Sequence, residues 1–349
     1  MAIVSSLAVS ARVTLNLHNL NSEGTEGNQQ QTRMVHILDS RGNRAVVNAV
    51  SGDMFKHILV DHLIPLLQEA GQPLSPGAAK HDADRINADN QAFVDFCEKE
   101  QEFRSGNRVE RRKARESEIM TRMLKDCSAT DLAGALVTRG RAVGRKSVVE
   151  FGWVVGLPDS TVTEQYFHVK YAPEGRGEAA GGTTVAGQQA IFHRPASSGE
   201  YALVCNLDLW RIGLNDITRE IVIEERDRVA RGRALLQALA ATLMKPAGAQ
   251  RNTQNPHIMA CHGVVTTSNS SLPAPTISPL ADDFETQIAA VATACNRLRP
   301  GTIEVHPFRT LADAVDLLVS LAADLALPEA PLQAGAGSTD GREGGESGS

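Results

Sequence analysis

The spacing of apolar residues predicts an amphipathic helix over residues 51–70, opened by a polar, glycine-bearing turn. Eight apolar residues recur at helical spacing and would cover one broad face: Met54, Phe55, Ile58, Leu59, Leu63, Ile64, Leu66 and Leu67. Ser51 or Asp53 can cap the N-terminus, and Gly71 stands where a C-terminal cap belongs. The first turn therefore offers free backbone N–H groups to an anion, with Lys56 one turn further in. An ordinary capped core helix would begin in the same way.

Alternating apolar and polar residues predict strands before and after this helix. Residues 3–20 form a half-buried strand in which Val13, Leu15 and Leu17 share one face. A polar loop at 21–33 leads to a hairpin of two strands, 34–39 and 45–50. Further strands are predicted at 148–155, 201–210 and 303–305, and further helices at 224–244, 282–298 and 310–325, the last capped by Thr310.

Two groups of cations lie between the first helix and residue 148. Residues 72–86 are loop-like, and a charged helical segment over 87–126 carries a basic cluster of Arg104, Arg108, Arg111, Arg112, Lys113 and Arg115. This cluster is either a solvated helix face or a nucleic-acid contact. The second group precedes the strand at 148–155 and consists of Arg139, Arg141, Arg145 and Lys146. A glycine-lysine-serine pattern there resembles a phosphate loop, but its spacing is wrong by one residue and a strand follows it, which disfavours nucleotide hydrolysis.

Residues 164–194 have the composition of a long hairpin with a mobile tip. Two extended arms, 164–171 and 188–194, flank a glycine-rich stretch at 173–187. The arms interleave aromatic and cationic residues: Phe167, His168, Lys170, Tyr171, Phe192, His193 and Arg194. A hairpin that stacks on bases and contacts phosphates needs this combination. A long exposed loop without function is the alternative, although long loops are more often functional or disordered.

A second polar loop follows the helix at 224–244. It is dense in hydrogen-bond donors and contains Gly248, Gln250, Arg251, Asn252, Gln254 and Asn255. From about Leu327 onward the chain becomes low-complexity and acidic, and disorder is expected there.

Composition narrows the class of protein. The 349 residues are 42% apolar, enough to bury a core in one large or two smaller domains. The five cysteines form no CxxC pair, no secretory signal opens the chain and no apolar run could span a bilayer, so reduced thiols in the cytoplasm are expected. The formal net charge of −6 disfavours a wholly basic nucleic-acid binder, yet a binding face needs only local positive charge.

The motifs of common enzymes are missing. The sequence has no HExxH, no GxSxG and no Cys/His set with zinc spacing, so binding is favoured over catalysis, with no metal or cofactor. Asp53 and Asp39 lie near the polar loop at 21–33, but the sequence does not show them converging.

Several long sequence words resemble the Cas-seven backbone family of the RAMP superfamily, most closely its DevR/Csa-type branch from type I-A and I-B CRISPR Cascade complexes. They span about residues 5–325 and include LNLHNLNSEGTEGNQQQTR, AVSGDMFKHILVDHL, GRKSVVEFGW, QYFHVKY, FHRPASSGEYALVCNLDLWRIGLNDITRE, GAQRNTQNPH and LPAPTISPL. The resemblance implies an α+β fold with an RNA-recognition-motif (ferredoxin-like) palm. It implies one domain over 1–326, with helical fingers inserted at 72–126, a β-hairpin thumb at 164–194 and a disordered acidic tail at 327–349.

The resemblance also implies a function in antiviral defence. Many copies would polymerise helically along a CRISPR RNA and present it to a target DNA strand. They would work beside Cas-five-type, large and small Cascade subunits, in the cytoplasm and away from membranes. The predicted RNA-binding residues are Arg33, Ser51, Lys56, Arg139, Arg141, Arg145, Lys146, His168, Lys170, Arg194, Gln250, Arg251, Asn252 and Gln254. No residue is predicted to be catalytic.

Two other functions stay open at this point. The first is an RNA-cleaving backbone subunit of the type III kind, for which Asp53 is the candidate acid, although helix capping is its more ordinary role. The second is a transcriptional regulator, which the family's older label suggests and which no helix-turn-helix pattern supports.

Overall fold

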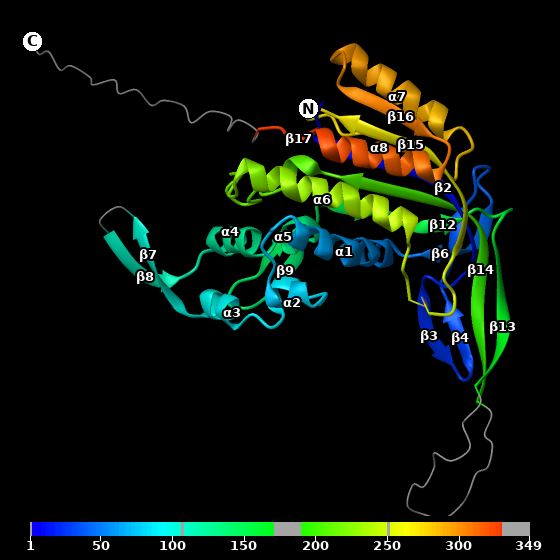
Figure 1. The fold of residues 1–349 in the computed structure, drawn as a ribbon, viewed down its shortest axis with the longest axis horizontal. Coiled ribbons are helices and arrows are strands. Elements are labelled where there is room, and N and C mark those ends of the chain that lie inside the picture. Colours follow the sequence, from blue (N-terminus) through cyan, green and yellow to red (C-terminus); the bar gives the residue numbers. More distant parts are fainter. Residues whose placement is uncertain (1, 106–107, 171–189, 250–251, 330–349) are drawn as a thin grey trace, which may run out of the picture.

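The computed structural model describes residues 2–105, 108–170, 190–249 and 252–329, which form a mixed α/β fold built on an antiparallel sheet (Figure 1). The strands of the principal sheet pair in the order β16 (Ile303–Phe308), β15 (His257–Ser268), β2 (Ser6–His18), β14 (Ala190–Leu207), β12 (Val154–Gly156), β6 (Arg44–Val50) and β5 (Met34–Leu38). Each pair along this path is antiparallel. The sheet therefore places segments next to one another that are far apart in the sequence.

Three helices cover one face of the sheet: α1 (Gly52–Glu69), α6 (Glu225–Met244) and α8 (Leu311–Asp324) (Figure 1). The apolar stripe of α1 is buried against the sheet and α6, as its spacing predicts. A fourth helix, α7 (Phe284–Leu298), packs on β16 through Phe284 and Ile288. Among the described residues no helix combines the length and hydropathy that crossing a bilayer requires.

Local sequence signals at the helix ends and at the first hairpin are confirmed. Ser51 caps α1 by accepting a hydrogen bond from the backbone N–H of Met54 at 3.2 Å, and Gly71 has φ +65° just beyond the helix. Thr310 caps α8 in the same way. The β5–β6 hairpin is closed by the carboxylate of Asp39, which accepts the backbone N–H of Asn43 at 2.7 Å.

The predicted strand at 148–155 is broken into β11 (Val149–Phe151) and β12. Gly152, between them, donates its N–H to the carbonyl of Val204 at 3.0 Å, and both pieces pair with β14. The first turn of α1 packs directly on this break, since a Cβ at Gly52 would overlap the carbonyl oxygen of Phe151. Only glycine allows this close approach between helix and strand.

The first strand departs from its predicted alternation at its end. Val13 and Leu15 are buried as expected, but Leu17 is 48% exposed and has φ +54°. Its backbone N–H donates to the hydroxyl of Ser198 at 2.9 Å, which holds the strand in this turned conformation.

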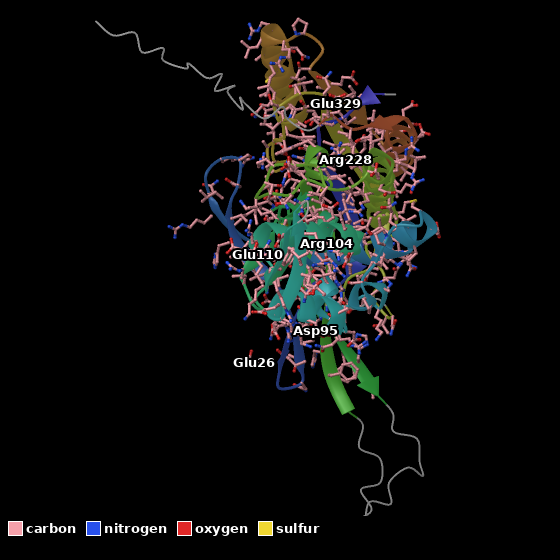
Figure 2. The ribbon with its side chains drawn as sticks, turned by 90° about the vertical axis from the view of Figure 1, so that its left-hand side faces the viewer. Glu26, Asp95, Arg104, Glu110, Arg228 and Glu329 are labelled. Carbon is pink, nitrogen blue, oxygen red and sulfur yellow. The ribbon has the colours of Figure 1, made fainter. Side chains whose placement is uncertain are left out.

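The helix prediction over 87–126 is wrong for its middle part. The segment contains α3 (Gln91–Glu98) and α4 (Glu116–Asp126), but β7 (Glu100–Ser105) and β8 (Arg108–Lys113) form an antiparallel hairpin between them. Figure 2, which views the molecule from this end, labels Arg104 and Glu110 on the hairpin. Arg112 anchors it, because its guanidinium lies 3.8 Å from the ring centroid of Phe103 and pairs with Glu118 at 2.7 Å.

Several further elements are short. They are β1 (Ala2–Ile3), which pairs with β17 (Leu325–Ala326), then α2 (Pro76–Ala79), η1 (Arg85–Asn87), α5 (Ser128–Ala133), β9 (Ala135–Val137), β10 (Val143–Arg145) and η2 (Leu209–Arg211). The one-turn α2 and η1 lie in the stretch 72–86 that was predicted to be a loop.

Candidate nucleic-acid interface

The predicted hairpin arms at 164–171 and 188–194 are confirmed as a strand pair in their described part. β13 (Val162–Lys170) runs antiparallel to the first half of β14, with Lys170 opposite Ala190 and Val162 opposite Ser198. The predicted glycine-rich tip at 173–187 lies outside the described residues. Figure 1 shows the two arms extending away from the sheet beside β3 and β4.

The polar segment at 21–33 is a hairpin rather than a loop. β3 (Ser22–Glu26) and β4 (Gln29–Thr32) pair with each other and lie against the arms, with Glu26 near the tip in Figure 2. His193 donates its backbone N–H to the carbonyl of Asn28 at 2.9 Å. The side chain of Gln165 donates to the carbonyl of Gln30 at 3.1 Å. The arms thus supply hydrogen-bond donors to the backbone carbonyls of the polar β3–β4 hairpin.

The loop at 252–255 also contacts the arms. Arg194 donates from its guanidinium to the hydroxyl of Thr253 at 2.9 Å, and Gln254 donates to the carbonyl of Pro195 at 2.7 Å. Asn252 is exposed. We call the meeting of residues 22–32, 192–195 and 252–254 the arm-base cluster. It joins both polar segments that the sequence predicts to face RNA to the base of the predicted thumb.

Aromatic rings line the arms next to this cluster. The rings of His168 and Phe192 are stacked with centroids 5.7 Å apart, and the Arg194 guanidinium lies 4.8 Å from the Phe192 centroid. Tyr166 and Phe167 are 42% and 59% exposed. Exposed rings beside a cation can stack on unpaired bases and contact phosphate.

A cavity of about 300 Å³ opens where α1 begins. We call it the α1 pocket; it is lined by Arg33, Ser51, Gly52, Asp53, Lys56, Val149, Glu150, Phe151 and Trp153. Three predicted RNA-binding residues, Arg33, Ser51 and Lys56, therefore share one cavity. Arg33 pairs with Glu23 of β3, and its guanidinium lies 5.1 Å from the ring centroid of Trp153.

Lys56 is the unpaired cation of this pocket. Burial lowers its pKa from the usual value, and the nearby Arg85 adds to that shift, while Asp53 and Glu150 oppose it. Within the described part of the chain no carboxylate lies within ion-pair distance of its ammonium group. A bound anion would therefore supply a partner that the folded chain does not.

Buried asparagines fix the wall of the pocket. Asn21 accepts the backbone N–H of Ser51 at 3.1 Å, so the segment between β2 and β3 positions the start of α1. Asn48 donates to the carbonyl of Arg33 at 3.0 Å and accepts the hydroxyl of Tyr201 at 2.9 Å. Neither residue was predicted from the sequence; for Asn48 the available signal was a polar side chain inside an apolar strand pattern.

The other predicted cations lie on the β9–β10 side. Arg139, Arg141 and Lys146 are exposed, and Arg141 is 3.6 Å from the carboxylate of Glu116. β9 and β10 pack against η1 and α4, which places these cations beside the α3–α4 region and not in the arm-base cluster.

The prediction that Arg145 contacts RNA is wrong. Its side chain is fully buried and its guanidinium donates to Asp131 at 2.8 Å, to Asp216 at 3.0 Å and to the carbonyls of Leu214 and Arg211. Every donor that could reach a phosphate is engaged inside the protein. Gln254 is also buried, and its donor is spent on Pro195, so the structure makes it a support of the cluster rather than a contact.

Three predicted residues cannot be placed. Gln250 and Arg251 lie outside the described residues, and for Lys170 only the backbone is described. Their roles stay predictions.

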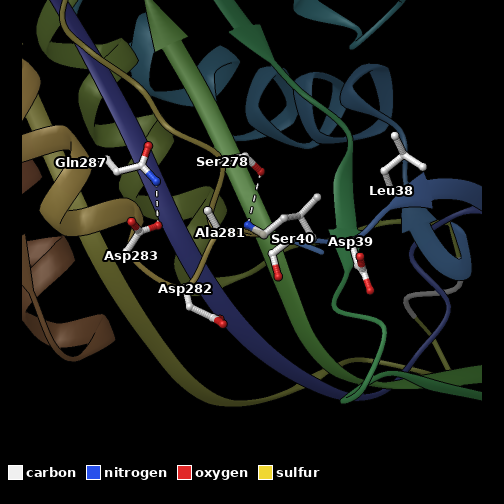
Figure 3. A pocket seen from close by; sticks show the side chains of 9 residues that line it. Leu38, Asp39, Ser40, Ser278, Ala281, Asp282, Asp283 and Gln287 are labelled. Atoms are coloured by element: carbon white, nitrogen blue, oxygen red, sulfur yellow. Dashed lines mark hydrogen bonds between the residues drawn. The ribbon is translucent and has the colours of Figure 1, made fainter. Parts of the chain in front are cut away.

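A second cavity, of about 500 Å³, is acidic and holds none of the predicted residues (Figure 3). Asp39, Asp282 and Asp283 line it, and Asp283 accepts from Gln287 at 2.6 Å. Asp282 pairs with Arg12 at 2.8 Å, so Asp39 and Asp283 supply the remaining negative charge, which does not favour a phosphate. Among the residues that the structure describes, no group of three His, Cys, Asp or Glu side chains could hold a metal ion.

The sequence matches the model of one known protein family. A family model described as "CRISPR-associated negative auto-regulator DevR/Csa2" matches residues 9–288. A solved chain titled "CRISPR RNA-guided surveillance complex, pre-nicking" is similar at a TM-score of 0.48 and 11% identity, covering 91% of this chain and 99% of that one. Another, titled "CRISPR RNA-guided surveillance complex", has a TM-score of 0.43 and 10% identity, covering 91% and 98%. No curated protein sequence matches the chain significantly.

Proposed function

Because this chain belongs to the DevR/Csa2 family of CRISPR-associated proteins, we propose that it is the CRISPR RNA-binding backbone subunit of a type I Cascade-like interference complex. Copies would follow one another along the guide, present it to a target DNA strand and contact the other Cascade subunits. The observation that carries the proposal is the arm-base cluster, where two polar segments, from distant parts of the sequence, meet an aromatic, cationic strand pair.

The sheet topology supports an RNA-recognition-motif palm. In chain order, β2, α1, β12, β14, α6 and β15 follow a strand-helix-strand-strand-helix-strand pattern, and the strands lie side by side in the order β15, β2, β14, β12. This is the arrangement of a ferredoxin-like unit. The hairpins β3–β4 and β5–β6 are insertions between β2 and α1, and β13 extends from β14 as the arm of a thumb.

Contacts with the guide are proposed to be phosphate-directed and independent of sequence. Lys146→Ala should therefore weaken binding to all single-stranded RNAs alike and lower the slope of log affinity against log salt by about 0.7. Titrations at several salt concentrations measure this slope. Arg309→Ala is the matched control, because Arg309 is exposed at the start of α8 and paired with Glu285. An unchanged slope for Lys146→Ala would remove that residue from the interface.

The subunit is proposed to be non-catalytic. Asp53 stands in the first turn of α1, and its neighbours in the α1 pocket are one carboxylate, Glu150, and the cations Arg33 and Lys56. Guide-loaded protein incubated with complementary RNA and Mg²⁺ should leave that RNA intact. Cleavage at regular intervals, lost in Asp53→Ala, would contradict this proposal and favour an RNA-cleaving subunit of the type III kind.

A further inference from the structure

Trp153 is a large aromatic residue that the fold leaves 45% exposed at the α1 pocket. It lies in the break between β11 and β12, directly after Gly152, which contacts β14 too closely to carry a side chain. The backbone there is held from both sides, by β14 and by the first turn of α1. The backbone that carries Trp153 is therefore held in place, and its side chain lines the α1 pocket.

Arg33 restrains this ring further. Its guanidinium lies 5.1 Å from the indole centroid, while its Nε donates to Glu23 of β3. Through β3 and β4 the pocket is continuous with the arm-base cluster, since β4 also contacts β14. The Arg33–Glu23 pair thus links the lining of the α1 pocket directly to the arm-base cluster.

The size and lining of the pocket fit one nucleotide. A cavity of about 300 Å³ is at the small end of ligand pockets and too small for a duplex. Its charges are mixed: Lys56 suits a phosphate, whereas Asp53 and Glu150 accept hydrogen bonds and suit the amino group of a base or a ribose hydroxyl. A site selected for phosphate alone would not carry two carboxylates.

We propose that the α1 pocket takes one unstacked base of the bound RNA, stacked on Trp153, with its phosphate towards Lys56. This inference rests on the proposed function and names the subsite, and the stacking chemistry, through which that function holds one nucleotide. Trp153 is a binding residue that the sequence analysis did not single out.

The fluorescence of Trp153 can be measured separately, because the chain has only one other tryptophan, Trp210. In Trp210→Phe, Trp153 is the sole emitter, and single-stranded RNA should quench it. In Trp153→Phe, the emission of Trp210 should not respond; Trp210 lies in η2 beside Arg219, away from the pocket. Adenosine 5′-monophosphate serves as a second probe, which reports on the pocket without any backbone contacts.

Affinity provides the second readout. Trp153→Ala should weaken RNA binding by roughly 5- to 150-fold, the range of one lost base stack, while the salt slope stays at its wild-type value. Trp153→Phe keeps a ring and should recover most of the affinity, and thermal melting of both variants checks that they fold.

The outcomes separate the two proposals. Normal RNA affinity in Trp153→Ala together with unquenched Trp153 would overturn the stacking site and leave the backbone function standing. Failure of the wild type to bind RNA, with Trp153 still quenched by the mononucleotide, would overturn the backbone function and keep a nucleotide pocket. If neither RNA nor adenosine 5′-monophosphate bound to the protein, both proposals would be overturned.

Discussion

Asp131→Asn should lower the free energy of unfolding by about 3–5 kcal/mol, the largest effect we expect from one substitution. Asp131 is fully buried and accepts Arg145 and Arg231, each at 2.8 Å, and the backbone N–H of Gly213 at 3.0 Å. Asparagine would keep the shape but leave the buried guanidinium of Arg231 without a countercharge among the described residues and that of Arg145 with Asp216 alone. Such a loss is a large part of the total stability of most domains.

Urea unfolding followed by circular dichroism measures this change. Asp89→Asn is the matched control, because Asp89 pairs with Lys80 at 2.6 Å on the surface, where water screens the pair, so its unfolding midpoint should stay at the wild-type value. A wild-type midpoint for Asp131→Asn would mean that the buried arginines find another partner and that Asp131 does not hold α5, β10 and α6 together.

Acidification should destabilise the protein through His18. The side chain is 1% exposed at the end of β2, packs edge-on against Tyr201, and its ring nitrogens have no hydrogen-bond partner in the described residues. Burial lowers its pKa from 6.5 to about 4. The native state therefore favours the neutral imidazole. The stability that depends on this neutral form is fully present above pH 6.5 and is lost as the pH falls towards 4. Integrated over that window, the loss is about 3 kcal/mol.

Comparison of His18→Gln with the wild type tests this prediction. Urea unfolding at pH 7, 5.5 and 4.5 should show that the gap between the two proteins shifts in favour of the variant as the pH falls, because glutamine does not take up a proton. His36→Gln, at an exposed position of β5, should follow the wild-type profile. A pH-independent gap between His18→Gln and the wild type would show that His18 is not buried in its neutral form.

The family was recognisable from sequence words alone, and the family model over residues 9–288 confirms that resemblance. Secondary-structure elements with local sequence signals could also be predicted. α1 was predictable because its apolar spacing, its Ser51 cap and Gly71 all lie within one short segment. The β5–β6 hairpin was predictable because two alternating strands and a polar turn are adjacent in the chain.

Residues 100–113 are a segment where the local spacing of apolar residues does not predict the secondary structure. Phe103 and Val109 are their only apolar residues besides Gly106, so neither a helical nor a strand period of apolar residues exists to distinguish the two structures. The hairpin forms through contacts at its ends, such as Arg112 with Phe103 and Glu118.

Arg141 and Arg145 show most clearly what a sequence pattern cannot predict, because the same pattern assigned both residues a role in binding. Arg141 is exposed, whereas Arg145 is enclosed by Asp131 and Asp216, which come from other parts of the chain. The sequence by itself determined the family, the capped helix and the aromatic, cationic arms, because those signals are local. Only the tertiary structure decided which cations reach the surface and that Arg33, Lys56 and Trp153 share one pocket. The physical reason is that antiparallel strand pairing and buried ion pairs join residues that no local spacing connects.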